Sequence, residues 1–224
     1  MSLTLAEYRM WLDGTQARCW QRPHPLAAWQ MQSFVGTPEA ALAELLDGAR
    51  GRVSLRLGGS LAPTVCLPWL DGLHQPGDWQ GYARQWLSRH FGGEPEDWLA
   101  CWQWQPAGRN TLACGVRLAH WQVWRALLQR LSLLSVRPVW PLLAQRHRPP
   151  RQVTQTLLLR DGDVLQWLLH EQGQWQQGGI LRVEAGLARQ AVLDRLAELS
   201  IPLVLPRWFS LDDTASQPFV WSES

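Results

Sequence analysis

Residues 8–20, YRMWLDGTQARCW, and residues 156–169, TLLLRDGDVLQWLL, carry the same local signal. In each stretch an Asp-Gly pair, Asp13-Gly14 or Asp161-Gly162, separates two apolar, strand-like runs. Asp-Gly in this setting favours a tight turn with positive backbone φ, so each stretch predicts a β-hairpin. Helix and strand signals follow both hairpins. The chain therefore indicates one structural unit used twice, the second time in shortened form.

Composition indicates a globular protein with a large core. The length of 224 residues is enough for one large domain or a domain and a half. Of these residues, 46% are hydrophobic and 18% are charged. The net charge of +2 is too small to argue for a nucleic-acid partner. The apolar runs are far shorter than the roughly 20 residues that span a bilayer. Residues 1–14 contain Glu7 and Asp13 and lack a basic segment, so we expect no signal peptide and a cytoplasmic location.

Several kinds of chemistry are excluded or disfavoured by residue type. All 21 basic residues are Arg, which rules out a P-loop lysine and a Schiff-base lysine. The six histidines lack zinc-ligand spacing, and no cysteine belongs to a CxxC pair. We therefore expect no metal and no cofactor. The four cysteines are interpreted as small buried hydrophobic residues, and they are Cys19, Cys66, Cys101 and Cys114.

The order of expected elements is that of an α/β (α+β) protein. Thr37-Pro38-Glu39 is a strong helix start, with Thr as N-cap, and Asp78 is taken as the N-cap of a second helix reaching about residue 91. Pro149-Pro150 marks the best boundary, which divides the chain into residues 1–148 and 149–224. Residues 206–224 form a turn-rich tail. Further helices are expected at 118–131 and 186–199. Strands are expected at 53–57, 98–105, 111–117, 133–140 and 201–205. Two more strands are expected to end at residue 67 and near residue 183.

This order resembles the actin-like ATPase superfamily, whose members are built from two ribonuclease-H-like lobes. More closely, it is similar to the cytoplasmic assembly proteins of type IV pili and type II secretion, the PilM- and GspL-like proteins. The matching stretches are VCLPWL at 65–70, DWQGYARQWLSRHFG at 78–92, TLACGVRLAHWQVWRALL at 111–128 and SVRPVWPLLAQRHR at 135–148. The resemblance implies a first ribonuclease-H-like lobe followed by a shortened second lobe that opens with the second hairpin.

The chain departs from the nucleotide-binding members of that superfamily. Their hairpins carry a phosphate loop of the form Asp-x-Gly-Thr/Ser, and Asp13-Gly14-Thr15 is one residue short of it. Asp163, after Asp161-Gly162, places an acid where phosphate oxygens would approach. Gly178-Gly179 is interpreted as a hairpin turn, not as an adenosine pocket. Plain tight turns explain both hairpins better than ATP binding does.

Two other catalytic interpretations fail on context. Gly58-Gly59-Ser60 loosely resembles a nucleophile elbow, but Pro63 and strand-like residues follow where a helix is needed. A two-metal nuclease would need several converging acids. Asp13, Glu39 and Glu44 are better explained by a turn and a solvated helix face.

We therefore expect a non-enzymatic, actin-like scaffold that docks protein components of a pilus or secretion assembly at the inner membrane. With no membrane span of its own, it would need a membrane-anchored protein partner. In the pilus branch of the family, that partner offers a short N-terminal peptide. Two alternatives remain open: an ATPase or phosphotransferase that keeps the ancestral cleft, and a peptide- or carbohydrate-binding module that uses exposed tryptophans.

The chain has 16 tryptophans, and most are expected to fill the core. Trp69 follows Pro68 in a loop, whereas Trp208 and Phe209 lie beyond the last expected strand. These three are the candidate partner-binding residues, because exposed aromatic anchors dominate interface energetics. The alternative is that they are lids over the hydrophobic core.

Overall fold

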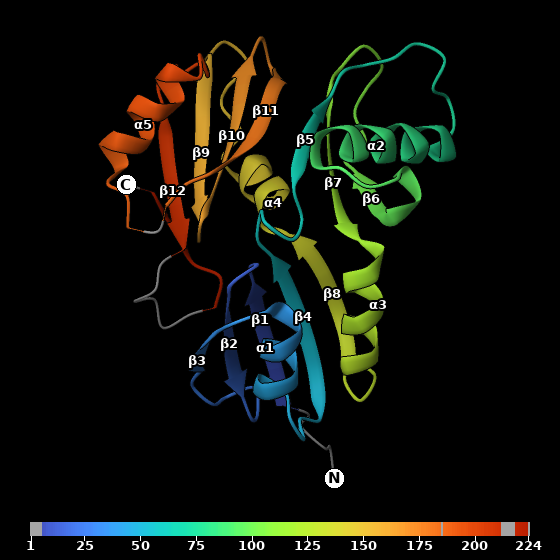
Figure 1. The fold of residues 1–224 in the computed structure, drawn as a ribbon, viewed down its shortest axis with the longest axis vertical. Coiled ribbons are helices and arrows are strands. Elements are labelled where there is room, and N and C mark those ends of the chain that lie inside the picture. Colours follow the sequence, from blue (N-terminus) through green and yellow to red (C-terminus); the bar gives the residue numbers. More distant parts are fainter. Residues whose placement is uncertain (1–5, 185, 212–217, 224) are drawn as a thin grey trace.

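The computed structural model describes residues 6–184, 186–211 and 218–223 of the chain. Figure 1 shows two large sheets, one below the other, and a small third sheet beside the upper one. Within the described residues the two large sheets have five strands each and the small sheet has three. The mixed α/β class expected from the sequence is confirmed.

The lower sheet of Figure 1 is built on the first hairpin. Its strand order is β3-β2-β1-β4-β8. β1 (Ala6–Leu12) pairs antiparallel with β2 (Gln16–Arg22), as predicted, and β2 pairs antiparallel with β3 (Gln30–Val35). β4 (Gly51–Leu57) and β8 (Ser132–Pro138) run parallel to β1 on its other side. The parallel pairs require crossover connections, and helices supply them.

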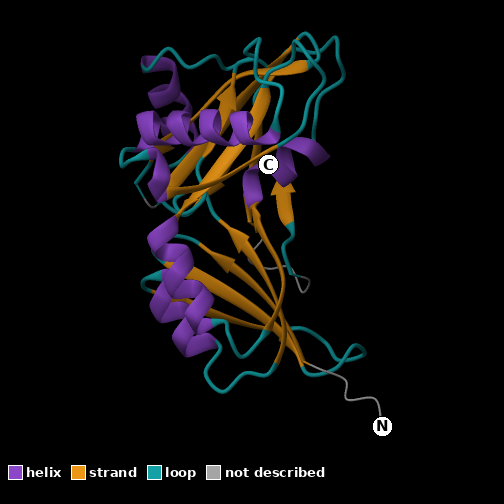
Figure 2. Ribbon diagram, turned by 90° about the vertical axis from the view of Figure 1, so that its right-hand side faces the viewer, coloured by secondary structure: helices purple, strands orange, loops and turns teal. Residues whose placement is uncertain are grey.

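Two helices cover one face of this sheet, as Figure 2 shows. α1 (Pro38–Leu45) begins at Thr37, whose side chain accepts a hydrogen bond from Ala40 N at 3.3 Å, so this N-cap prediction is confirmed. α3 (Leu118–Leu127) is shorter than the predicted 118–131. Its apolar face, which includes Trp121 and Trp124, packs on the sheet. The shared core includes Met10, Leu12, Leu42, Val53, Leu55, Trp124 and Leu128.

The small sheet has the order β5-β7-β6 and is antiparallel throughout. It consists of β5 (Thr64–Leu67), β6 (Trp98–Trp102) and β7 (Thr111–Arg117), and a short 3-10 helix (Pro95–Asp97) precedes β6. One face packs on α2 (Pro76–Phe91) through Trp79, Ala83, Leu87, Trp98 and Ala113.

The start of α2 differs from the prediction. The N-cap is Gln75, and Asp78 is the third helical residue, whose carboxylate accepts a hydrogen bond from Gln75 N at 3.0 Å. The pair forms a capping box, so Asp78 still closes the helix start, but from inside the first turn. Pro76 occupies the first helical position, where a missing N–H costs nothing.

The second large sheet repeats the plan of the first. β9 (Gln155–Asp161), β10 (Val164–Glu171) and β11 (Gln174–Arg182) form an antiparallel meander, and β12 (Arg207–Leu211) pairs parallel with β9. The order β11-β10-β9-β12 matches β3-β2-β1-β4. α5 (Arg189–Glu198) connects β11 to β12 as α1 connects β3 to β4. One unit is therefore used twice. Its fifth strand, β13 (Trp221–Glu223), is short and antiparallel.

α4 (Val139–Arg146) was not predicted, and it joins the two large sheets. The expected strand 133–140 ends at Pro138, and the chain turns directly into this helix. Figure 1 places α4 between the lower sheet and the upper one. Trp140 and Leu143 of α4 belong to one core with Trp11 of β1 and with Leu157 and Phe209 of the second sheet. A continuous core therefore connects the units, and the division at residue 148 stays a prediction.

Other element predictions need correction in the second half of the chain. Residues 201–205 form no strand, and the strand that pairs with β9 is β12. Gly178 and Gly179 lie inside β11, packed against Leu168 and Trp167, so they form no hairpin turn. The turn from β10 to β11 is Gln172-Gly173, where φ is 51° and 81°.

The expected strand 98–105 ends at Trp102, and the expected helix 186–199 begins at Arg189. Among the described residues, no helix combines the length and apolarity required to cross a membrane.

Candidate functional site

The two Asp-Gly hairpins meet each other across the junction of the two large sheets. Asp161 Oδ2, at the end of β9, accepts a hydrogen bond from Gly59 N of the first unit at 2.8 Å. On the other side, Asp13 accepts hydrogen bonds from Gly14 N and from the Ser60 hydroxyl. Both carboxylates are buried. The turn 58–60 therefore lies directly between the two hairpins.

The approach at this contact leaves no room for a side chain. A Cβ built on Gly162, where φ is +64°, would lie 1.9 Å from Asp13 Oδ2. A Cβ on Gly59 would lie 2.3 Å from the side-chain nitrogen of Gln166. Contact with the opposite unit disfavours a side chain at both positions, and at Gly162 the positive φ also favours glycine. The residues of the two hairpins thus fill the space between the two units.

The electrostatics of the contact oppose a bound phosphate. Burial and, to a smaller extent, the nearby Asp13 carboxylate together raise the pKa of Asp161 to about 8. Burial also raises the pKa of Asp13, to which the charge of Asp163 adds, while hydrogen bonds from Ser60 and Gly14 act in the opposite direction. The raised pKa values of Asp161 and Asp13 mean that this contact disfavours negative charge, so it would also disfavour a phosphate.

A cavity of about 340 Å³ lies next to this contact. Ser60, Arg117, His120 and Arg182 are among its lining residues. Arg117 already donates to Phe91 O at 2.8 Å, and its guanidinium lies 4.1 Å from the centroid of the Trp98 ring. His120 contacts the Glu39 carboxylate at 2.9 Å. The side chains of Arg117 and His120 are therefore already engaged in contacts that stabilise the fold.

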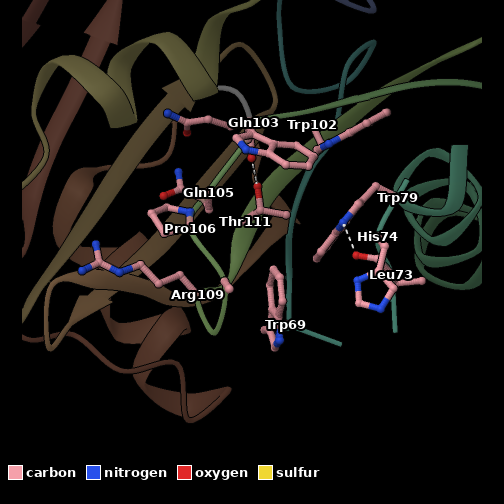
Figure 3. A pocket seen from close by; sticks show the side chains of 12 residues that line it. Trp69, Leu73, His74, Trp79, Trp102, Gln103, Gln105, Pro106, Arg109 and Thr111 are labelled. Atoms are coloured by element: carbon pink, nitrogen blue, oxygen red, sulfur yellow. Dashed lines mark hydrogen bonds between the residues drawn. The ribbon is translucent and has the colours of Figure 1, made fainter. Parts of the chain in front are cut away.

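A second candidate site is an aromatic pocket beside the small sheet, with a volume of about 220 Å³. Figure 3 shows Trp69, Trp79 and Trp102 around one space, with Arg109 and His74 on opposite sides of Trp69. Trp69 comes from the loop after β5, Trp79 from α2, and Trp102 from the end of β6. The pocket thus forms where two loops meet the start of α2.

Hydrogen bonds fix the walls of this aromatic pocket. The rings of Trp69 and Trp79 are 5.4 Å apart, and Trp79 Nε1 donates to Leu73 O at 3.2 Å. Asn110 Oδ1 accepts from Trp69 N at 3.1 Å, while Asn110 Nδ2 donates to Trp175 O of β11 at 3.1 Å. One asparagine therefore ties both pocket loops to the second large sheet.

The charge of the pocket is positive. His74 and Arg109 line it, and among its described lining residues there is no carboxylate. The nearby Asp71 accepts a hydrogen bond from Trp69 Nε1 at 2.7 Å. The guanidinium of Arg109 has no hydrogen bond or ion pair within the described part of the chain, so it is available to a ligand.

The three predicted partner residues lie in different environments. Trp69 lines the aromatic pocket. Trp208 and Phe209 lie in β12 and are 4% and 0% exposed, with Trp208 packed beneath α5 and Phe209 in the core shared with α4. As folded, neither presents a surface to a partner, which is the behaviour of core residues. The assignment of Trp69 to a partner site stays a prediction.

Trp104 and Arg109 also line the pocket, and the sequence did not mark either as a partner-binding residue. Trp104 is 66% exposed and lies past the end of β6. It falls inside the strand 98–105 that the sequence predicted. The signal that could have found it is the polar, turn-forming run QPAGRN at 105–110, which ends the strand early.

Comparison with known proteins supports the fold assignment. No family model and no curated protein matches the sequence. Among solved structures, the cytoplasmic domain of EpsL, an inner-membrane component of the type II secretion system of Vibrio cholerae, is similar with a TM-score of 0.56 and 14% identity, covering 93% of this chain and 86% of that one. A Bacteroides thetaiotaomicron protein with an actin-like ATPase fold and unknown function has a TM-score of 0.55 and 10% identity, covering 95% and 84%.

The PilM–PilN type IV pilus biogenesis complex is also similar, with a TM-score of 0.48, 12% identity, and coverage of 88% of this chain and 65% of that one. The likeness to the first two structures shows that the chain has the actin-like fold, the fold of the EpsL cytoplasmic domain among others. The resemblance predicted from the sequence is confirmed.

Proposed function

We propose that this protein is a non-catalytic cytoplasmic scaffold that docks protein components of a type II secretion or type IV pilus assembly at the inner membrane. The observation that carries the proposal is the direct contact between the two hairpins. In an actin-like fold these hairpins flank the nucleotide phosphates, and here Asp13, Asp161 and Gly162 fill the space between them. Similarity to the EpsL cytoplasmic domain over 93% of the chain supports the same class of role.

The aromatic pocket is the docking site that we assign to this function. Trp, Tyr and Arg residues are enriched among the side chains that carry binding energy at interfaces. The pocket combines four tryptophan side chains with the guanidinium of Arg109, which has no hydrogen bond or ion pair among the described residues. Its occupant is a partner peptide that inserts one apolar side chain next to a carboxylate.

The experiment that tests the docking site is co-purification of the tagged chain from membranes of its native cells. Trp104→Ala with Arg109→Ala alters one exposed and one half-buried side chain of the pocket. We expect the fold to survive and capture of the secretion or pilus partner to fall at least tenfold. Arg50→Ala, at an exposed arginine outside the pocket, is the matched control. Unchanged capture by the double variant would place the partner elsewhere.

The competing function, an ATPase or phosphotransferase, is tested by thermal unfolding with millimolar Mg-ATP. A ligand at 100 times its Kd stabilises the native state by about 2.7 kcal/mol. For a chain of this size that corresponds to a rise in Tm of roughly 5 °C or more. We expect no rise. A clear rise that Arg182→Ala abolishes would assign a nucleotide to the cavity beside the hairpins and overturn the scaffold proposal.

A further inference from the structure

Two cysteines far from any CxxC spacing are neighbours in the fold. Cys101 of β6 and Cys114 of β7 are directly opposite each other in the antiparallel pair. Their sulfur atoms are 3.1 Å apart. Directly opposed residues in such a pair have Cα atoms about 4.5–5.5 Å apart. That separation lies within the range that a disulfide bridges without backbone movement.

The surroundings of the two sulfur atoms differ. Cys101 is exposed at the edge of the small sheet, so the prediction that all four cysteines are buried is wrong for this one, whereas Cys114 is buried in the central strand. Both line a cavity of about 310 Å³ that separates this face of the sheet from Pro141 and Leu142 of α4. A small oxidant can therefore reach Cys101 from solvent, and the second sulfur lies immediately behind it.

The pair is also polarised. A hydrogen bond from Cys114 holds the pKa of Cys101 below its ordinary value, while the same contact and burial raise the pKa of Cys114. The thiolate is the reactive form of cysteine. The other two cysteines behave differently, because burial raises the pKa of Cys19 and of Cys66 to about 12.

We infer that Cys101 and Cys114 form a site of reversible oxidation, with Cys101 the sulfur that reacts with a peroxide and Cys114 the sulfur that resolves the product into a disulfide. In the first step the Cys101 thiolate attacks one peroxide oxygen, the O–O bond breaks, and hydroxide leaves and takes up the proton that Cys101 released. In the second step the Cys114 sulfur attacks the sulfenic acid, the S–O bond breaks, and water leaves with the Cys114 proton. Two thiols are oxidised and one peroxide becomes two waters.

The test is hydrogen peroxide treatment of the reduced, full-length protein, followed by alkylation of the remaining thiols and mass spectrometry. We expect the mass to fall by two hydrogens, two of the four cysteines to be alkylated, and a cross-linked peptide that joins Cys101 to Cys114. A reductant should restore four alkylated cysteines. Four free thiols after treatment, or a bridge that includes Cys19 or Cys66, would overturn the inference.

Single variants separate the two roles. Cys101→Ser changes an exposed position, so it should fold normally and form no intramolecular bridge. Cys114→Ser should leave Cys101 oxidised but unresolved, which a sulfenic-acid-specific reagent detects at that residue alone. If Cys114→Ser unfolds the chain, the Cys101→Ser result still decides, because a bridge formed without Cys101 contradicts the proposed pair.

Discussion

At the scale of single residues, the buried carboxyl of Asp161 controls how stability depends on pH. Its pKa is raised to about 8, chiefly by burial, whereas an unfolded Asp titrates near pH 3.9. Between these values the folded state holds more protons than the unfolded state, so stability falls as pH rises from about 4 to 8. Asp161→Asn keeps an acceptor for Gly59 N and removes the ionisation.

We therefore expect Asp161→Asn to be more stable than the natural protein at pH 8, by on the order of 2 kcal/mol, with a smaller difference at pH 5. Urea unfolding at the two pH values measures this, and Asp47→Asn, at an exposed position, is the control. Parallel pH profiles for Asp161→Asn and the natural protein would show that Asp161 is ionised in both states.

Also at the residue scale, the sequence predicted the backbone role of both Asp-Gly pairs but not the environment of their side chains. Asp13 looked like an ordinary turn residue. It is buried against Ser60 only because the chain folds so that Gly14 and Ser60, which are 46 residues apart, come into contact. Glu39 looked like a solvated acid, yet it accepts from Trp124 Nε1 at 2.8 Å, 85 residues away. Contacts between residues so far apart in the sequence depend on the topology of the fold, which local sequence patterns do not encode.

At the scale of elements, Glu39 connects the two helices on the first sheet. Its carboxylate, in the first turn of α1, accepts from Trp124 Nε1 of α3 and contacts His120 Nδ1 at 2.9 Å. Removal of the carboxylate leaves the indole N–H of the buried Trp124 without its partner. An unsatisfied buried donor costs about 1–3 kcal/mol.

We expect Glu39→Ala to lower the free energy of unfolding by that amount, as measured by urea denaturation. Glu44→Ala removes an exposed acid from the same helix and should change stability by about 0.5 kcal/mol or less. Equal effects from the two variants would mean that the link between α1 and α3 contributes nothing.

Prolines lie at both places where sequence patterns missed an element. A strand was predicted at 133–140, but α4 begins at Val139, after Pro138, and contains Pro141. The first turn of a helix tolerates proline because its N–H groups need no helical partner. For β12, the apolar run 201–205 was the more obvious strand. Pro202 interrupts that run and Leu205 has a φ of 42°, so the ladder with β9 forms at Arg207–Leu211 instead. At β12, tertiary pairing therefore overrode the local pattern.

At the scale of the whole molecule, the duplicated unit predicted from two Asp-Gly pairs gives the chain its architecture. The hairpins of the two copies face each other, and α4 fills the core between their sheets. The actin-like fold was therefore recognisable from the sequence. The direct contact between the two hairpins could not be recognised from the sequence, because it depends on Gly162 of one copy touching Asp13 of the other.

Gly162→Ala tests whether this contact holds the two units together, and Gly48→Ala is a closely matched control. The two glycines have φ of +64° and +63°, so a methyl group strains both backbones by a similar 1–2 kcal/mol. Only at Gly162 does the new Cβ meet another unit, 1.9 Å from Asp13 Oδ2, whereas at Gly48 nothing lies within 4 Å. The difference between the variants therefore isolates the junction from the backbone.

We expect Gly162→Ala to lose about 1–3 kcal/mol more than Gly48→Ala, the usual cost of overpacking. Small-angle X-ray scattering should show a larger radius of gyration for Gly162→Ala alone, because the units separate to accommodate the methyl group. If the two variants lose equal stability and keep equal size, the core around α4 holds the units by itself. The hairpins would then be free to part, and the exclusion of nucleotide from between them would lose its physical basis.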